Sequence, residues 1–168
     1  MNNLPAASIS KYPKLKYLAV SLFLCLLDQL TKFVVVKNLA PFSSIRVTGF
    51  FNLVNVRNVG AAFGSFRGLG NDVFIGIAGA AVLVILYLVI KSERDNFAYC
   101  LLLGGAAGNL IDRFLRGYVV DFLDFHTEGL RFADSLQWAA GYHWPAFNAA
   151  DSALTIGIFV MIAGQFRK

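Results

Sequence analysis

The run VFIGIAGAAVLVILYLVI, from Val73 to Ile90, carries no charged residue. About 20 apolar residues in a helix cross a hydrocarbon core about 30 Å thick, so this run predicts a membrane-spanning helix. Hydrophobic residues make up 57% of the chain and charged residues 15%, compared with roughly 25% charged residues in soluble domains. This balance argues against an ordinary soluble domain and predicts an integral membrane protein.

Three further stretches have the length and composition of membrane-spanning helices. These three stretches cover about residues 17–36, 96–114 and 147–166, and the run 73–90 is the second of the four along the chain. The first of them follows three lysines, as the apolar part of a secretory signal does, but no small-residue cleavage site comes after it. We therefore interpret it as a retained span. The predicted fold class is an all-α membrane protein, with four spans in a single integral membrane domain covering residues 1–168.

The basic residues predict how the chain is oriented in the membrane. Lysine and arginine concentrate in cytoplasmic loops, and the basic N-terminus, the loop with Lys91 and Arg94, and the basic C-terminus all fall on one side. We therefore expect both termini in the cytoplasm and two longer segments, 37–72 and 115–146, on the outer side. The net charge of +5 comes from residues between apolar runs rather than along one polar face. Nucleic-acid binding is therefore not predicted.

The two outer segments show weaker secondary-structure signals. Alternating residues at 45–47 and 53–57, with Gly49 between them, predict a short β-ribbon. Four glycines between residues 60 and 70 then predict a loop that changes direction. In the second outer segment, residues 128–145 suggest a short interfacial helix, because tryptophan favours the boundary between membrane and water.

Several polar residues lie where lipid would surround them. Asp28 and Lys32 are one helical turn apart in the first span and predict an ion pair, which either tethers helices or contacts substrate. Asn109 and Arg113 share a face at the outer end of the third span, with Asp112 beside them. Arg113 either binds a lipid phosphate or orients a peptide or carboxylate inside the protein. Small residues that allow close helix approach precede this group: Gly104, Gly105 and Gly108.

Other polar residues give less specific signals. Asn58 is either a turn former or part of a site. His126 and His143 have no partners at metal-ligand spacing, so we expect ordinary interfacial residues and no metal site. Cys25 and Cys100 lie in apolar stretches without a CxxC motif, which argues against a disulfide framework or a zinc site.

Two aspartates remain, Asp121 just after the third span and Asp151 at the start of the fourth. If these spans are antiparallel neighbours, both carboxylates lie at the same outer level and can meet. Two carboxylates a few Å apart in a low dielectric share a proton. Such a pair is either an aspartic-protease dyad or a pair that binds a cation or relays protons in a transporter. On chemistry alone both hypotheses stay open.

Five sequence blocks, DQLTK, NVRNVGAAF, GGAAGNLIDR, VVDF and FNAADS, occur in this order between Asp28 and Ser152. Together they closely resemble the bacterial lipoprotein signal peptidases, or signal peptidase II. The resemblance implies a four-helix aspartic peptidase of the bacterial inner membrane that acts without metal or organic cofactor. Its substrate would be a prolipoprotein, cut just before the lipid-modified cysteine, on the periplasmic side of the membrane.

The resemblance also implies roles for individual residues. Asp121 and Asp151 match the family's catalytic dyad. The residues that match positions lining the site or supporting it are Asn58, Asn109, Arg113, Asn148, Asp28, Lys32 and Asp112. The first outer segment would form an extracytoplasmic β-cradle with a mobile helical lid. Lipidated prolipoprotein, membrane lipid and globomycin-type inhibitors are the implied partners, and a monomer is expected to suffice.

Two features depart from a simple transfer of the family pattern. The stretch 124–144 is longer than is usual between the two catalytic blocks, so its shape is not carried over. Asp124 lies three residues after Asp121 and competes with it as a dyad member. Because VVD is the family's block, we assign the dyad to Asp121 and expect Asp124 to face solvent or lipid headgroups.

Overall fold

The computed structural model describes residues 13–60, 70–92, 97–127 and 142–166. Its long helices are α1 Pro13–Asn38, α2 Asn71–Lys91, α3 Phe97–Arg116 and α5 Ala149–Gln165. Each begins and ends within a few residues of a span expected from hydropathy. Among the described residues, α1 and α2 are long and apolar enough to cross a membrane, and α5 is a shorter apolar helix.

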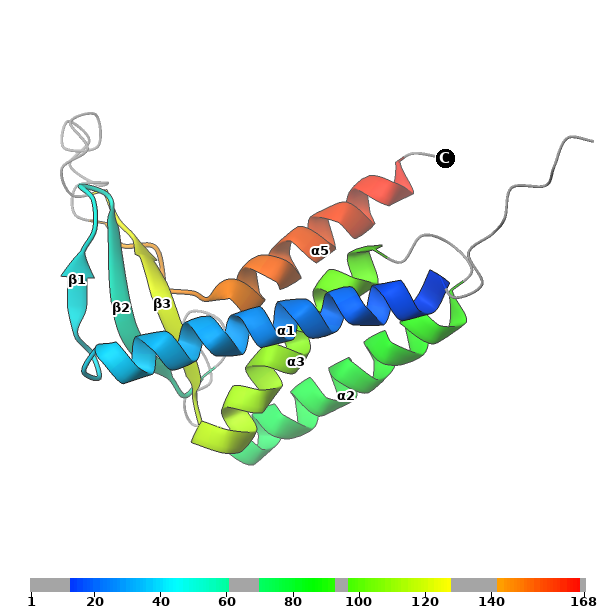
Figure 1. Ribbon diagram of the computed structural model, residues 1–168, viewed down its shortest axis with the longest axis horizontal. Helices are drawn as coiled ribbons and strands as arrows, with labels where there is room; N and C mark the ends of the chain where they lie inside the picture. Colours follow the sequence, from blue (N-terminus) through cyan, green and yellow to red (C-terminus); the bar gives the residue numbers. More distant parts are fainter. Residues whose placement is uncertain (1–12, 61–69, 93–96, 128–141, 167–168) are drawn as a thin grey trace, which may run out of the picture.

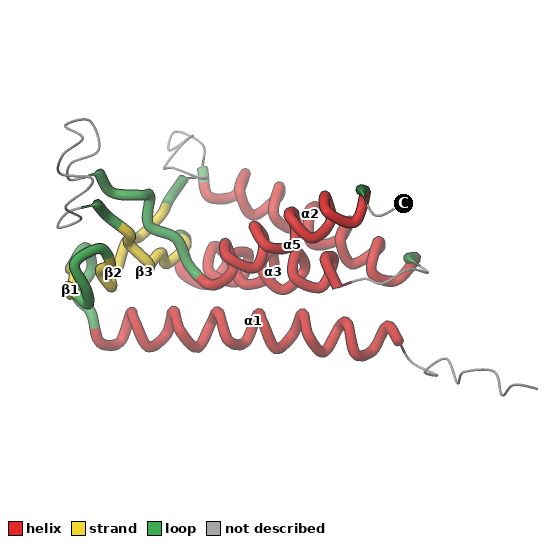
Figure 2. The backbone as a smooth tube through the Cα atoms, turned by 90° about the horizontal axis from the view of Figure 1, so that it is seen from above, coloured by secondary structure: helices red, strands yellow, loops and turns green. Residues whose placement is uncertain are grey.

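The helices lie side by side, and a small sheet covers one end of them (Figure 1). Helix α3 packs against α1, α2 and α5, while α1 runs along one flank of the group (Figure 2). The start of α1 and the end of α2 meet at the end away from the sheet, where Lys14 Nζ donates a hydrogen bond to the Ile90 carbonyl. The basic helix ends are therefore separated from the outer segments, as the charge pattern predicts.

The sheet has three antiparallel strands in the order β1-β2-β3. They are β1 Ser44–Arg46, β2 Phe51–Asn58 and β3 Val119–Phe125. The β1–β2 hairpin confirms the predicted ribbon, but the third strand was not predicted. β3 is buried along almost its whole length, so it lacks the alternation that identifies a half-exposed strand. The cradle is thus built from both outer segments rather than from the first alone.

Residues 142–147 run back along β3 and carry the chain into α5. The Phe147 amide donates to the Leu123 carbonyl at 3.1 Å, and the Trp144 amide donates to the Phe125 carbonyl at 2.8 Å. These hydrogen bonds connect β3 to the residues just before α5. The segment 142–147, called the return segment below, therefore fixes the position of the α5 N-terminus relative to the sheet.

Two expectations fall on parts of the chain that the structure does not describe. The helical lid is expected in the first outer segment, of which residues 61–69 are not described, and most of the expected interfacial helix falls on residues 128–141. Both ranges are outside the described residues.

Glycines in α3 let its backbone approach two other helices, as their small size predicts. A Cβ atom at Gly104 would lie 2.8 Å from the Ser21 carbonyl oxygen of α1. A Cβ atom at Gly105 would lie 2.5 Å from the Ala150 carbonyl oxygen of α5. This close packing brings the polar residues at the outer end of α3 beside the first turn of α5.

Gly105→Ala is expected to destabilise the protein by about 1–3 kcal/mol, because the added methyl group must displace the backbone of α5. The measurement is thermal unfolding in detergent micelles. Gly79→Ala in α2 is the matched control, since nothing lies within 4 Å of a Cβ atom there. The control should leave the midpoint unchanged or slightly raised, because alanine favours helix over glycine. Equal midpoints for the two variants would show that the α3–α5 contact is not tight.

Candidate active site

The two candidate aspartates come from different elements and are connected through two asparagines. Asp121 lies on β3 and is 2% exposed, and Asp151 lies in the first turn of α5. Asn148 Nδ2 donates to Asp121 Oδ1 at 2.7 Å, and Asn109 Nδ2 donates to Asp151 Oδ1 at 2.8 Å. Asn148 Nδ2 also lies 3.2 Å from Asn109 Oδ1. The structure thus brings both aspartates and both asparagines into one hydrogen-bonded group.

Asn148 is the N-cap of α5, and its cap geometry fixes the Asp151 side chain. Asn148 Oδ1 accepts from the Asp151 amide at 2.9 Å, while Asp151 Oδ2 accepts from the Asn148 amide at 3.2 Å. This reciprocal arrangement is a capping box, which satisfies amide groups that a helix start leaves unpaired. An asparagine can cap the helix with its oxygen and still donate to Asp121 with its nitrogen.

Asn58, at the end of β2, holds the second oxygen of Asp121. Its Nδ2 donates to Asp121 Oδ2 at 2.9 Å, and its Oδ1 accepts from the Gly60 amide at 3.0 Å. Asn58 therefore shapes the end of the strand and also contacts the candidate dyad. The contact with the Gly60 amide fits a turn former, and the role of Asn58 in a site stays a prediction.

Burial, and after it the negative charge of Asp151, raise the pKa of Asp121 to about 7. The hydrogen bonds from Asn58 and Asn148 act in the opposite direction, because they stabilise the ionised carboxylate. The Asp121 carboxyl therefore keeps its proton to a higher pH than an ordinary aspartate does.

A buried ionic group lies next to these residues, centred on Lys32, which is 0% exposed. Its Nζ is 2.8 Å from Asp28 Oδ2 and 3.1 Å from Asp112 Oδ2, and it donates to Asn109 Oδ1 at 2.9 Å. The predicted ion pair between Asp28 and Lys32 is confirmed. Since the lysine is fully enclosed, its contacts fit a tether between helices that also holds Asn109 in place.

The two carboxylates of this group bind backbone amides near the candidate dyad. Asp28 Oδ1 accepts from the Ala150 amide at 2.9 Å, and Asp112 Oδ2 accepts from the Val120 amide at 2.9 Å. Ala150 precedes Asp151, and Val120 precedes Asp121. The ionic group therefore holds the backbone next to each candidate aspartate: Asp28 binds it beside Asp151, and Asp112 binds it beside Asp121.

Arg113 is buried and joins three elements. Its guanidinium group lies 4.5 Å from the centre of the Phe74 ring of α2, and its Nη2 donates to the Gly60 carbonyl just after β2. Its own carbonyl accepts from Asn71 Nδ2 at 3.0 Å. These contacts favour the internal role over binding of a surface lipid phosphate. They also hold the residues that follow Asn58.

Two cavities meet at the site. The larger has a volume of about 850 Å³ and includes Asp121 in its lining, and the smaller has a volume of about 550 Å³ and includes Asp151. Four residues line both cavities: Asn58, Trp144, Pro145 and Ala146. The shared wall therefore belongs to β2 and the return segment. An extended chain passing from one cavity to the other would have one carboxyl group on each side of this wall.

Asp124 does not face solvent, which corrects the expectation from sequence. It is 6% exposed, and its carboxylate lies 2.9 Å from Asn52 Nδ2 and 3.0 Å from His143 Nδ1. The physical reason is that β3 lies between β2 and the return segment, so neighbours cover it on both edges. No local sequence pattern indicates this burial, because the return segment follows after a long intervening stretch.

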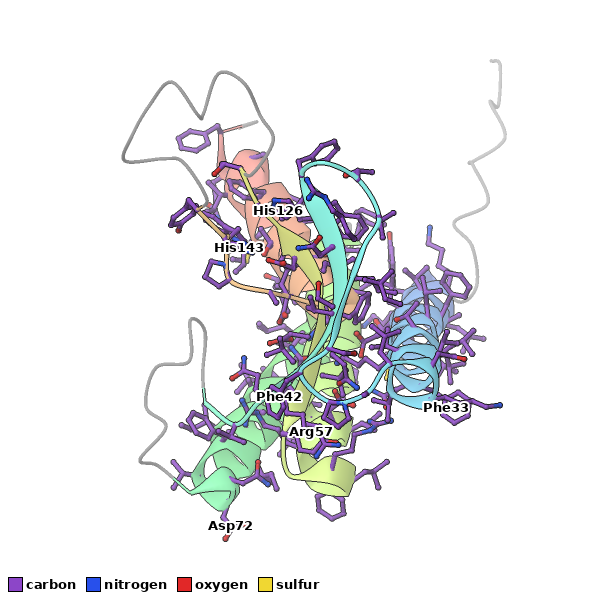
Figure 3. The ribbon with its side chains drawn as sticks, turned by 90° about the vertical axis from the view of Figure 1, so that its left-hand side faces the viewer. Phe33, Phe42, Arg57, Asp72, His126 and His143 are labelled. Carbon is purple, nitrogen blue, oxygen red and sulfur yellow. The ribbon has the colours of Figure 1, made fainter. Side chains whose placement is uncertain are left out.

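The two histidines are not independent surface residues either. His126 is buried, and its ring stacks on that of His143 with centroids 5.0 Å apart (Figure 3). Within the part of the chain that the structure describes, no group of three or more His, Cys, Asp or Glu side chains is arranged to hold a metal ion. The histidine pair instead connects the end of β3 to the return segment.

The amino-acid sequence matches one protein family and relatives with a shared name. The family model described as Signal peptidase (SPase) II matches residues 20–167. The lipoprotein signal peptidase of Thermodesulfovibrio yellowstonii is 42% identical over 156 residues, which cover 92% of this chain and 98% of the relative. That of Francisella tularensis subsp. novicida is 41% identical over 164 residues, covering 91% and 92%.

Two solved structures of a bacterial membrane enzyme, obtained by the in meso method, have similar folds. One has a TM-score of 0.76 at 33% identity and covers 90% of this chain and 88% of that chain. The other has a TM-score of 0.73 at 33% identity and covers 91% and 94%. Since the family model and the relatives match nearly the whole length of the chain, this protein belongs to the signal peptidase II family of proteases.

Proposed function

We propose that this protein is an intramembrane aspartic endopeptidase that removes signal peptides from diacylglyceryl-modified prolipoproteins, cutting before the lipidated cysteine. The observation that carries the proposal is the placement of Asp121 and Asp151, held by Asn148 and Asn109 where two cavities meet. The names of the relatives support the choice of substrate.

In the proposed reaction, a water molecule lies between the two carboxyl groups. The ionised carboxylate takes a proton from water, the water oxygen attacks the scissile carbonyl carbon, and the protonated carboxyl donates its proton to the carbonyl oxygen. As the tetrahedral intermediate collapses, the carboxyl that took a proton from water donates it to the leaving nitrogen and the C–N bond breaks. The other carboxylate takes back a proton from a hydroxyl group of the intermediate, which restores the starting state of the pair. The raised pKa of Asp121 supports its assignment as the protonated partner. No metal or organic cofactor enters this scheme.

The other residues of the site would support the dyad. Asn58 and Asn148 each donate to one oxygen of Asp121, and Asn109 does the same for Asp151. Such donors keep the carboxyl groups in one orientation, which catalysis requires. The buried ionic group around Lys32 and the contacts of Arg113 would hold the elements that carry these donors.

We place the protein in the bacterial inner membrane as a single domain with four spans, both termini cytoplasmic and the site near the periplasmic face. The positions of the basic helix ends, away from the sheet, support this orientation. The acyl chains of the substrate would lie between helices in the bilayer. Each CH₂ of these chains anchors the substrate in the membrane by about 0.8 kcal/mol, which holds the substrate at the depth of the site. A monomer would suffice, and a globomycin-type inhibitor would occupy the same groove.

The test uses the purified protein with a lipidated prolipoprotein and with the same polypeptide lacking the lipid. The proposal predicts a mass shift for the lipidated form alone, abolished by globomycin. A small transporter that uses the same carboxylate pair for proton or cation coupling would give substrate flux in proteoliposomes and no cleavage. That second outcome would refute the proposed function.

The rate of cleavage should fall as the pH rises through about 7, because the proposed proton donor Asp121 then loses its proton. Above this range kcat/KM should fall by about tenfold for each pH unit, with an apparent pKa that belongs to the pair. The measurement is kcat/KM from about pH 5 to pH 9, with thermal unfolding followed over the same range as a control. A flat alkaline limb in the folded enzyme would contradict this assignment.

A further inference from the structure

One polar group beside the site has no role in the proposed reaction. Asp124 and His143 form a carboxylate–imidazole pair, with His143 Nδ1 lying 3.0 Å and 3.1 Å from the two carboxylate oxygens. Asp124 lies on β3 and His143 lies on the return segment, and isolated β-bridges join these two segments. Both residues line the larger cavity, together with Asp121.

The orientation of the imidazole ring is fixed from several directions. Asp124 also accepts from Asn52 Nδ2 at 2.9 Å, so its carboxylate is held by β2 as well. The His126 ring stacks on the other side of His143 at 5.0 Å. Figure 3 shows both histidines at the end of the molecule that carries the sheet. A ring held in this way cannot reorient freely.

The carboxylate also decides which ring nitrogen carries the proton. A carboxylate that accepts from Nδ1 selects the Nδ1–H tautomer of a neutral imidazole, and this is the form in which we take His143 to bind. Nε2, which Asp124 does not engage, then presents a lone pair and acts as an acceptor. The same logic lets a buried aspartate set the histidine tautomer in serine proteases. The His143 side chain is 45% exposed, so part of it is open to a ligand.

The larger cavity is the one on the side of the sheet, whereas the smaller is lined by residues of α5. In the proposed orientation the sheet lies on the outer side of the membrane, so a substrate chain that leaves the membrane there would pass along the sheet. The portion after the scissile bond would therefore occupy the larger cavity. An extended peptide offers backbone N–H donors in this position, and Nε2 of His143 is an acceptor of matching chemistry.

We propose that His143 binds a backbone N–H group of the substrate on the mature side of the scissile bond, and that Asp124 positions His143 for this contact. The proposal rests on the proposed function, because it assigns part of the substrate to the larger cavity. His143 is then a substrate-binding residue, and Asp124 acts only through it. Neither takes part in the proton transfers at Asp121 and Asp151.

The first experiment measures kcat and KM with a lipidated prolipoprotein peptide. His143→Phe keeps a ring that can stack on His126 but removes Nε2, and should raise KM about tenfold with kcat nearly unchanged. His143→Gln retains an acceptor and should recover most of the loss. Asp124→Asn should raise KM by a similar factor in the wild-type background and by little in the His143→Phe background. Tyr142→Phe, the neighbouring control, should leave both constants unchanged, since its contacts with Thr127 use its backbone atoms.

The second experiment moves the change to the substrate, and its main result needs only the folded wild-type enzyme. Peptides carry an N-methyl group at one of the first three amides after the cysteine. One of these peptides should be cleaved by the wild type with a KM raised about tenfold. With His143→Phe, the KM for this methylated peptide should be nearly the same as the KM for the unmodified peptide.

Three results would overturn the inference while leaving the proposed function intact. These are an unchanged KM in His143→Phe, a loss confined to kcat, or full additivity of the Asp124 and His143 substitutions. Equal KM values for all methylated peptides and the unmodified peptide would overturn it as well. Absence of any cleavage by the wild type would instead refute the proposed function, and this inference with it.

Discussion

Asp121→Asn and Asp151→Asn are each expected to lower the rate of prolipoprotein cleavage by about a thousandfold or more. The physical reason is that one carboxyl group must accept a proton from water while the other donates one, and an amide does neither. Both substitutions are nearly isosteric, so the helices should still insert and the protein should still unfold cooperatively. The measurement is the rate of product formation with equal amounts of purified, folded enzyme.

Asp72→Asn provides a matched control for this pair. Asp72 lies in the first turn of α2, is exposed, and is distant from the two histidines in Figure 3. Its substitution should leave the rate within about twofold of wild type, as is usual for surface changes far from a site. If either Asp121→Asn or Asp151→Asn cleaved as fast as Asp72→Asn, the dyad assignment would be wrong.

Lys32→Met is expected to produce the largest loss of stability, about 3–5 kcal/mol. The substitution leaves the buried carboxylates of Asp28 and Asp112 without the cation that lies between them. Arg116 still contacts Asp112, so the uncompensated charge should fall mainly on Asp28. Asn109 also loses a donor, which should loosen its hold on Asp151 and lower the cleavage rate.

The measurement is the thermal unfolding midpoint in detergent micelles, and Lys37→Met is the control. Lys37 lies in the last turn of the same helix and is exposed, so its removal costs no buried ion pair. Exposed charges contribute at most about 1 kcal/mol, and the control should shift the midpoint little. Equal midpoints for the two variants would mean that the buried ionic group does not hold the helices together.

The helices and the hairpin could be predicted because their signals are local. A charge-free run such as 73–90 has few structural alternatives, and the small glycines before Asn109 indicate close helix packing. The meeting of Asp121 and Asp151 followed from one assumption, that the third and fourth spans are antiparallel neighbours. The structure brings the two residues into one hydrogen-bonded group, although their catalytic role stays a prediction.

Other parts of the site depend on pairing between distant segments, which no local pattern encodes. β3 is buried on both faces, so its apolar sequence does not alternate, and the partners of Asp124 come from β2 and the return segment. The cap formed by Asn148 has a recognisable local pattern, an asparagine three residues before an acid. Its second hydrogen bond, to Asp121, becomes visible only once β3 is placed beside it.

The central claim is most directly tested by identifying the product of the reaction. Purified wild-type protein is incubated with a lipidated prolipoprotein, and the N-terminus of the mature product is determined by mass spectrometry. The account predicts one new product that begins at the lipid-modified cysteine, formed by the wild type and absent with Asp121→Asn and Asp151→Asn. An intact substrate, a cut elsewhere, or the same product from either variant would contradict it.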